Sequence, residues 1–365
     1  MISYTGRNRQ TVNALKTMYF DGPEWTPCGV YFLPSAWMAH REALEEVVLA
    51  HPRLFPWHKK GSVDFDFKTG MWNPLYELGR HTDAWGVVWD NCARGFDSQA
   101  VVHPLADWAD FEAWKKRVPN PLKDDMFGPR QAWDEVKRGF EAARARGDLA
   151  GGGGLPHGFF FMMLTYLRGF ENCMLDIATD EPRLHELIEI ITRHHVTVVG
   201  KYLELGAETM GFGEDLGMQT SLPMSPAAWR RFIKPTYERM IGPCRDRGVP
   251  VFLHSDGHIL EIIPDLIEVG VTTLNPQFRA NGLAGLRAVA KGKIAIHLDL
   301  DRQLFPFATP SQIEDHIGEA FEALYDPRGG LSLGAECGPD VSPEKVDAIC
   351  SALERLCKPP APAGA

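Results

Sequence analysis

The sequence lacks a continuous apolar run of about 18 residues, the length that a membrane-spanning helix requires. Its first residues, Met1 to Lys16, are polar and contain no apolar core of a secretory signal. We therefore expect a cytoplasmic protein that does not span a membrane. An excess of basic residues is also missing, because the formal net charge is −10. This charge argues against a general nucleic-acid or anionic-membrane binder.

The sequence has few cysteines for its length, seven in 365 residues, and none of them forms a CxxC pair. They are scattered and odd in number, which favours reduced thiols over a disulfide framework. A phosphate-binding loop is missing as well. The glycine run Gly151–Gly154 has neither the GxGxxG spacing nor a following Lys-Ser/Thr pair, so we interpret it as the end of a strand.

What is present is a regular alternation of strands and helices in the second half of the chain. With 44% hydrophobic residues, the chain can bury a sizeable core. We expect strands at 208–213, 249–257, 271–275, 293–297 and 330–334, and helices at 226–247, 259–269, 283–290, 310–325 and 343–356. Further strands near residues 29, 86 and 149 bring the count to about eight, which predicts a (β/α)8 TIM barrel. A doubly wound sheet is the alternative.

The N-terminal part of the chain is less regular and rich in aromatic residues. We expect a short helix before residue 18, a strand at 28–34 and a helix at 37–50, followed by aromatic segments up to Trp89. These segments predict an elaborated N-terminal cap region on one barrel domain, residues 1–357. Residues 358–365 are rich in proline and alanine, and we expect a disordered tail there.

The strand at 249–257 carries the most informative polar residues. Its apolar run stops at its carboxyl end, where His254 and Asp256 follow two residues apart. Alternation along an extended strand puts both side chains on the same face. In α/β enzymes the chemistry is placed at the carboxyl ends of parallel strands. The alternative is that Asp256 caps the next helix and His254 is a hydrogen-bonded core residue.

Polar residues fall at the carboxyl ends of the other predicted strands too. In a barrel these positions converge on one mouth. Their side chains are of the types that bind zinc, for which three protein ligands and one open position make a catalytic site. The candidate metal ligands are Glu214, His254, Asp256 and Cys337. Taken singly, Glu214 could equally be a helix cap or ion-pair partner, and Cys337 a small apolar residue.

Several further motifs are informative in combination and cover almost the whole chain. They are His254–Gly257, Ile262–Gly270, Leu274–Gln277, Glu214–Gly217, Met224–Pro226, Phe232–Pro235, Asp301–Gln303, Thr309-Pro310, Asp83–Trp89 and His103–Ala106. Together these motifs resemble the uroporphyrinogen decarboxylase superfamily, and the last two of them resemble segments of its methyltransferase branch. The resemblance implies a single (β/α)8 barrel.

The resemblance implies two alternative chemistries. Decarboxylases of the superfamily hold porphyrinogen propionates with an N-terminal arginine motif, and the corresponding segment here, Val30–Trp37, contains no arginine. The methyltransferases use zinc held by a His-x-Cys strand end and a late cysteine, and they work with a corrinoid protein. His254 and Cys337 match this pattern, whereas Asp256 replaces the other cysteine. An oxygen ligand makes the metal harder and favours an oxygenated methyl donor over a thiol.

We therefore expect a zinc-dependent methyltransferase that moves a methyl group from a methoxylated small molecule, with aromatic methyl ethers among the candidates, to the cobalt of a separate corrinoid (cobalamin) protein. No Asp-x-His-x-x-Gly motif for binding cobalamin within the chain occurs. The pocket residues that orient groups or handle protons are expected to be Asn275, Gln277, His297 and Asp299. The alternatives are a metal-free decarboxylase of a tetrapyrrole or other carboxylate, and a non-catalytic barrel that binds a corrinoid or a partner. The sequence leaves undecided whether the protein forms a homodimer.

Overall fold

The computed structural model describes residues 3–71, 73–152 and 155–361. They form two compact units. Of the described residues, the first unit comprises 3–12, 80–90, 99–152 and 155–275, and the second comprises 13–71, 73–79, 91–98 and 276–361. Of the predicted tail 358–365, the last four residues lie outside the described part, as do Gly153 and Gly154 of the glycine run. No helix in the described residues is long and apolar enough to cross a membrane.

The first unit is built around neighbouring parallel strands. Strands β7 (Met210–Asp215) and β8 (Val251–Asp256) pair in parallel, with Asp215 opposite Asp256, and β9 (Thr273–Pro276) follows next to β8. In both β7 and β8, fully buried residues alternate with partly exposed ones. One face of each strand therefore belongs to the core, and the other face is more open.

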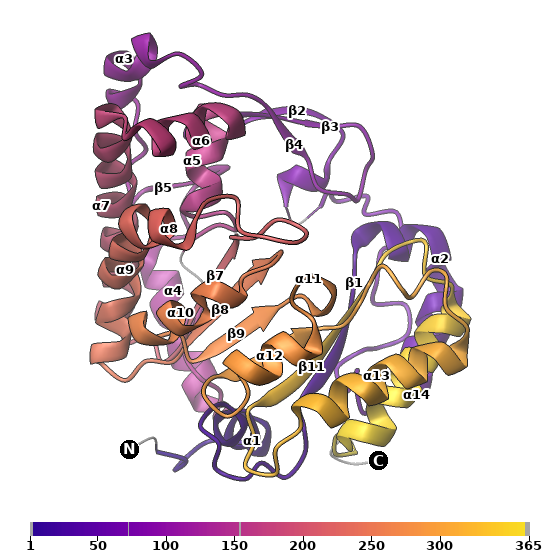
Figure 1. The fold of residues 1–365 in the computed structure, drawn as a ribbon. Coiled ribbons are helices and arrows are strands. Elements are labelled where there is room, and N and C mark those ends of the chain that lie inside the picture. Colours follow the sequence, from indigo (N-terminus) through magenta and orange to yellow (C-terminus); the bar gives the residue numbers. More distant parts are fainter. Residues whose placement is uncertain (1–2, 72, 153–154, 362–365) are drawn as a thin grey trace. The chain divides into compact units, whose positions relative to one another are not determined.

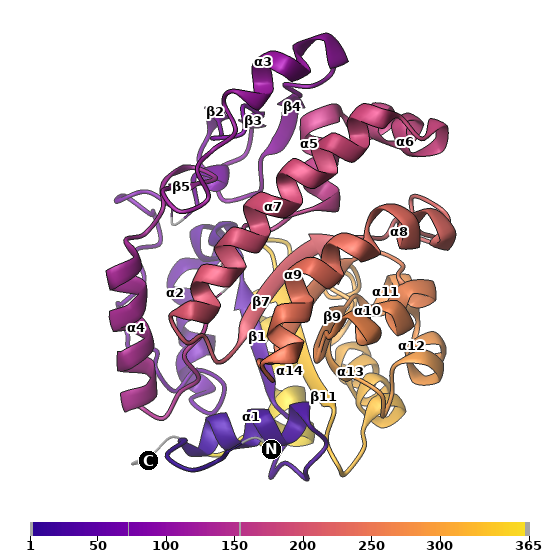
Figure 2. The ribbon, with the colours of Figure 1, turned by 90° about the vertical axis from the view of Figure 1, so that its left-hand side faces the viewer.

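Helices cover the buried face of these strands. The helices of this unit are α3 (Phe111–Lys115), α4 (Trp133–Ala145), α5 (Phe161–Arg168), α6 (Phe170–Thr179), α7 (Pro182–Glu204), α8 (Pro226–Phe232), α9 (Lys234–Asp246) and α10 (Ile263–Val269). Figure 2 shows α7 and α9 running side by side. Met210, Phe212, Val251 and Leu253 are almost fully buried on the helix-facing side.

The loops that follow β7 and β8 are in direct main-chain contact. Gly257 has φ +81°, and a Cβ atom added there would lie 2.2 Å from the carbonyl carbon of Gly217. The Gly217 N–H donates to the carbonyl of Asp256 at 3.2 Å, and the His258 N–H donates to that of Met218 at 2.8 Å. Only glycine permits this approach, because any side chain would separate the two loops.

The second unit repeats the strand–helix pattern. Strand β11 (Leu331–Cys337) pairs in parallel with β1 (Cys28–Phe32) on one side and β10 (Ala295–Asp299) on the other. Its helices are α2 (Pro34–Ala50), α11 (Phe278–Asn281), α12 (Leu283–Val289), α13 (Pro310–Leu324) and α14 (Pro343–Cys357). Figure 1 shows α13 and α14 side by side next to β11. The residues of helix α1 (Arg9–Met18) are divided between the two units: those up to Val12 belong to the first unit, and those from Asn13 belong to the second.

Most predicted elements are found, but three predictions need correction. The segment near residue 86 is not a parallel strand, because β3 (Val88–Asn91) pairs antiparallel with β4 (Gln99–Val102), next to β2 (Gly79–Thr82). The buried Asp83 carboxylate accepts hydrogen bonds from the backbone of Trp85 and Val87, which holds this segment in a turn. Near residue 149 the described residues contain one parallel bridge, Gly151 to Thr209, and no strand. Predicted helix 226–247 is two helices, α8 and α9.

Candidate metal centre

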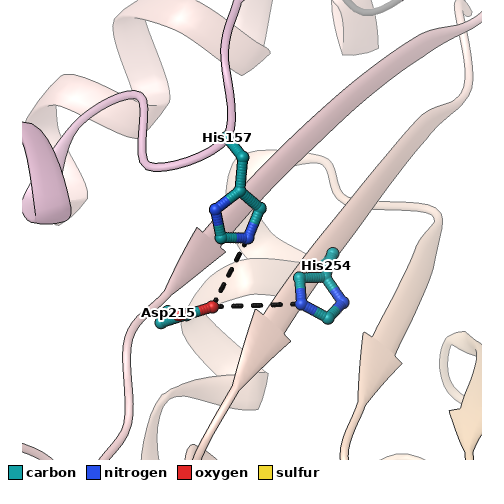
Figure 3. Close-up of side chains that lie close together, drawn as sticks. All are labelled: His157, Asp215 and His254. Carbon is teal, nitrogen blue, oxygen red and sulfur yellow. Dashed lines mark ion pairs between the residues drawn. The ribbon is translucent and has the colours of Figure 1, made fainter. Parts of the chain in front are cut away.

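The open face of β7 and β8 carries a cluster of two imidazoles and a carboxylate. His157, Asp215 and His254 each present one ligand atom, and the three atoms lie within 4.8 Å of one another. Figure 3 shows both imidazole rings directed at the Asp215 carboxylate. Asp215 Oδ1 lies 3.5 Å from His157 Nε2 and 3.9 Å from His254 Nε2. Asp215 is the last residue of β7, His254 lies two residues before the end of β8, and His157 comes from the segment before α5.

These distances fit a zinc ion. Zn–N and Zn–O bonds of about 2.0–2.1 Å in a tetrahedron place neighbouring ligand atoms roughly 3.3–3.4 Å apart. The observed separations are therefore close to those of a metal site and need only small side-chain adjustments. Two histidines and one carboxylate also make a three-ligand set that leaves a fourth position open, as catalytic zinc sites require.

The orientation of His254 is fixed by a neighbouring strand. Its Nδ1–H donates to Oδ1 of Asn275, on β9, at 2.7 Å. This bond leaves the Nε2 atom as the acceptor, pointing at Asp215 and at Asp256, whose Oδ1 lies 3.3 Å away. A lone pair facing two carboxylates is repulsive. A cation at Nε2, either a metal or a proton, removes that repulsion.

Among the predicted ligands, His254 and Asp256 share one face, as the alternation requires. Glu214 has a different environment from the one predicted. It is fully buried on the opposite face of β7, where one carboxylate oxygen accepts hydrogen bonds from the N–H groups of Phe160 and Met162, each at 2.9 Å. The Tyr237 hydroxyl donates to the other oxygen. Both oxygens are thus engaged away from the cluster, and we no longer assign Glu214 as a ligand.

The two other members of the cluster, Asp215 and His157, are not among the ligands predicted from the sequence. Asp215 stands directly after Glu214, and only the phase of the strand decides which of the two reaches the open face. His157 lies in an irregular segment that has no periodicity to guide a prediction. Gly213 gives it room, because a Cβ atom at this position would lie 2.8 Å from Cδ2 of His157.

The remaining predicted site residues belong to the second unit. His297, on β10, shares a hydrogen bond of 2.9 Å with the hydroxyl of Ser332, and Gln277 forms a parallel bridge with Asp299. Cys337 ends β11 opposite Phe32 and is fully buried. Burial, together with the nearby Glu336 and Asp340 carboxylates, raises the pKa of its thiol. The predicted roles of these four residues stay predictions.

The chain belongs to the uroporphyrinogen decarboxylase family, an enzyme family. The family described as Uroporphyrinogen decarboxylase (URO-D) matches residues 101–356, well over half of the chain. A uroporphyrinogen decarboxylase from Nocardia farcinica is 26% identical over 268 residues, 70% of each chain. One from Xanthomonas oryzae pv. oryzae is 25% identical over 186 residues, 48% of this chain and 50% of its relative.

The fold is similar to that of a solved methyltransferase. The methyltransferase from Methanosarcina mazei aligns with a TM-score of 0.56 at 15% identity, covering 94% of this chain and 98% of the other. Together with the family membership, this likeness confirms the predicted (β/α)8 barrel class. At such low identity it supports the fold and not the reaction.

Proposed function

We propose that the protein is a metal-dependent methyltransferase that acts on methoxylated small molecules, with zinc as the metal. The observation that carries this proposal is the cluster of His157, Asp215 and His254 on the open face of β7 and β8. The Asn275 side chain holds His254 with Nε2 toward the carboxylates, which is how an imidazole is presented to a metal.

The donor set favours an oxygen-containing substrate. All three ligand atoms in the first unit are nitrogen or oxygen, so the metal is harder than one held by thiolates. A metal of this kind supplies Lewis-acid polarisation of an ether oxygen. In the proposed reaction the cobalt(I) of a corrinoid carried by a partner protein would supply the electron pair for the new methyl–cobalt bond and become cobalt(III). The electron pair of the broken methyl–oxygen bond would stay on the oxygen, which would then take up a proton. Asp256, beside His254 Nε2, is placed to orient that imidazole or to bind the metal.

The N-terminal segment argues against a porphyrinogen as substrate. Between Val30 and Trp37 there is no arginine to hold a propionate. The structure has aromatic contacts there instead: the Phe32 ring lies 5.3 Å from that of Trp37 and 5.8 Å from that of Phe55. The nearby Arg41 is paired with Asp66 at 2.6 Å.

A metal-free decarboxylase is the second candidate, for two reasons. The two relatives described above are named uroporphyrinogen decarboxylase. The arrangement around His254 is also satisfied by a proton on Nε2, which would make an imidazolium that can protonate a carbanion.

Metal analysis and two assays separate the candidates. We expect about one zinc per chain and methyl transfer to free cob(I)alamin from one or more methoxylated aromatics, with no turnover of uroporphyrinogen. Metal-free protein that decarboxylates a porphyrinogen would replace the proposal with the second candidate. Cys337→Ala tests the ligand implied by the resemblance alone: a loss of zinc affinity would add a thiolate to the three ligands of the first unit, and unchanged affinity removes Cys337 from the ligand set.

A further inference from the structure

The segment that carries His157 is held to β7 by main-chain hydrogen bonds. The Gly158 N–H donates to the carbonyl of Gly213 at 2.8 Å. Two residues further on, the N–H groups of Phe160 and Met162 both donate to one carboxylate oxygen of Glu214. Glu214 therefore binds the beginning of α5, immediately after His157, and fixes where the helix starts.

The burial of the Glu214 side chain is energetically unfavourable in itself. The side chain is fully buried, and burying a carboxyl group away from water is unfavourable unless hydrogen bonds compensate it. Here two backbone N–H groups and the Tyr237 hydroxyl, from α9, supply that compensation. An apolar residue would fill the same position without this cost, but it would leave the Phe160 and Met162 N–H groups without these bonds. A buried glutamate at this position is therefore explained if the turn before α5 has to be held in one place.

His157 depends on this turn for its own position. Its side chain is 52% exposed, so packing alone does not hold it over the cluster. Its imidazole lies against Gly213, and its ring centroid is 5.5 Å from that of His254. A half-exposed ligand is fixed chiefly through its backbone, and that backbone is attached to β7 through Glu214 and Gly213.

We propose that Glu214 is a positioning residue for the metal site. Its carboxylate fixes the start of α5, so that His157 stays within reach of Asp215 and His254 and the metal is bound tightly. The inference rests on the proposed metal centre and adds a residue that acts on it from the opposite face of β7. Glu214 itself touches neither the metal nor the substrate.

A double-mutant cycle between Glu214 and His157 tests this role. Zinc affinity is measured by competition with a chromophoric chelator for the parent, Glu214→Ala, His157→Ala and the double variant. We expect Glu214→Ala to lower affinity on the order of 10–100-fold, as for other residues that orient a ligand. In the His157→Ala background the same change should have almost no further effect, since the ligand that it positions is already gone.

The conservative variant separates positioning from direct ligation. In Glu214→Gln the amide oxygen still accepts from Phe160 and Met162, so zinc affinity should stay within about threefold of the parent. Glu189→Ala is the matched control: this carboxylate on α7 pairs with Arg239 of α9 at 2.6 Å and has no role in the turn. Additive losses in the cycle, or an equal loss in Glu214→Gln and Glu214→Ala, would overturn the proposal.

A measurement on metal-free protein keeps this inference distinct from the proposed function. Hydrogen exchange of a peptide that covers residues 155–164 should accelerate in Glu214→Ala and stay slow in Glu214→Gln and Glu189→Ala. If the parent binds no zinc, the proposed function fails, and unchanged exchange in Glu214→Ala shows separately that the anchor is wrong. If Glu214→Ala does not fold, Tyr237→Phe replaces it, with a smaller acceleration because one of three hydrogen bonds is lost.

Discussion

Glu214 and Asp215 are neighbours in sequence with the same charge, and they lie on opposite faces of one strand. The Glu214 side chain is completely buried under α5 and α9, whereas that of Asp215 is 33% exposed. Glu214 binds two backbone N–H groups and a phenol, and Asp215 faces two imidazoles. In this strand the face, and not the residue type, decides whether a carboxylate builds the scaffold or the site.

The buried position of Glu214 also changes the pKa of its carboxyl group. Burial raises the pKa of Glu214 to about 7, although the hydrogen bonds from Tyr237, Met162 and Phe160 work in the other direction. The desolvation of the charged form therefore outweighs three favourable hydrogen bonds. The helix-facing side of β7 is thus a place where a carboxylate keeps its proton near neutral pH, which a metal ligand must not do.

The sharpest test of this contrast exchanges each carboxylate for its amide. Asp215→Asn should reduce zinc affinity by more than about 100-fold, beyond the loss expected for an orienting residue, because an amide is a poor zinc ligand. Chelator competition measures this, with Glu214→Gln as the control that stays near the parent value. Equal losses of zinc affinity in Asp215→Asn and Glu214→Gln would contradict the assignment of Asp215 to the metal site and of Glu214 to the scaffold.

The open face can also be disturbed without touching a ligand. Gly213→Ala places a methyl group 2.8 Å from Cδ2 of His157 and should displace that imidazole, with a loss of zinc affinity on the order of 10–100-fold. Gly211→Ala, two residues earlier on the same face, meets nothing within 4 Å and should bind zinc as the parent does. If both alanine variants bind zinc equally, His157 does not belong to the centre.

The buried carboxyl group of Glu214 should make the free energy of unfolding depend on pH. Because the pKa of Glu214 rises from 4.5 to about 7 on folding, the folded protein holds this proton more tightly than the unfolded chain. The stabilisation is complete below pH 4.5 and is lost as pH rises through 7. In metal-free protein, Glu214→Gln should therefore gain on the order of 2 kcal/mol relative to the parent between pH 5 and pH 8.

Denaturant titrations of the two proteins at both pH values measure this gain. The comparison cancels other groups such as His194 and His195, whose pKa values burial lowers to about 4 and about 3. Those groups destabilise the fold as pH falls below 6.5, which is the opposite trend. A constant difference between parent and Glu214→Gln would mean that Glu214 does not change its protonation on folding.

The smallest expected effect concerns the residue that aims His254. Asn275→Ala removes the acceptor of the Nδ1–H bond and should lower zinc affinity by about tenfold, the low end for such a partner. Asn275→Asp keeps an acceptor and should preserve affinity. Weaker zinc binding in Asn275→Asp than in Asn275→Ala would show that the hydrogen bond is not what matters at this position.

The sequence predicts much of the fold because strand–helix alternation is a local signal. The end of β8 is the best example: a buried apolar run followed by His254 and Asp256 identifies both the strand and its open face. Glu214 shows the limit. Alternation puts Glu214 in phase with the apolar Met210 and Phe212, and therefore on the buried face, and it puts Asp215 on the open face. The hydrogen bonds that make a buried carboxyl group acceptable there come from Phe160, Met162 and Tyr237, and the sequence of the strand does not show them.

His157 was beyond prediction for a different reason. Its place is set by Glu214 and Gly213, more than 50 residues later in the chain, and not by its own neighbours in sequence. Likewise, the turn near Trp85 depends on the Asp83 carboxylate, which binds backbone groups that a strand would have used for pairing. The contacts of His157 are tertiary, whereas those of Asp83 are local, and neither kind leaves a periodic trace in the sequence.

The main-chain contact between Gly217 and Gly257 has a consequence for how such a site can diversify. Because backbone meets backbone there, the spacing of the two strand ends does not depend on which ligands the strands carry. Asp256 can therefore be exchanged for a cysteine without a change in the distance between the two strand ends. A side chain at either glycine would instead push the two loops apart, although neither glycine bears a reactive group.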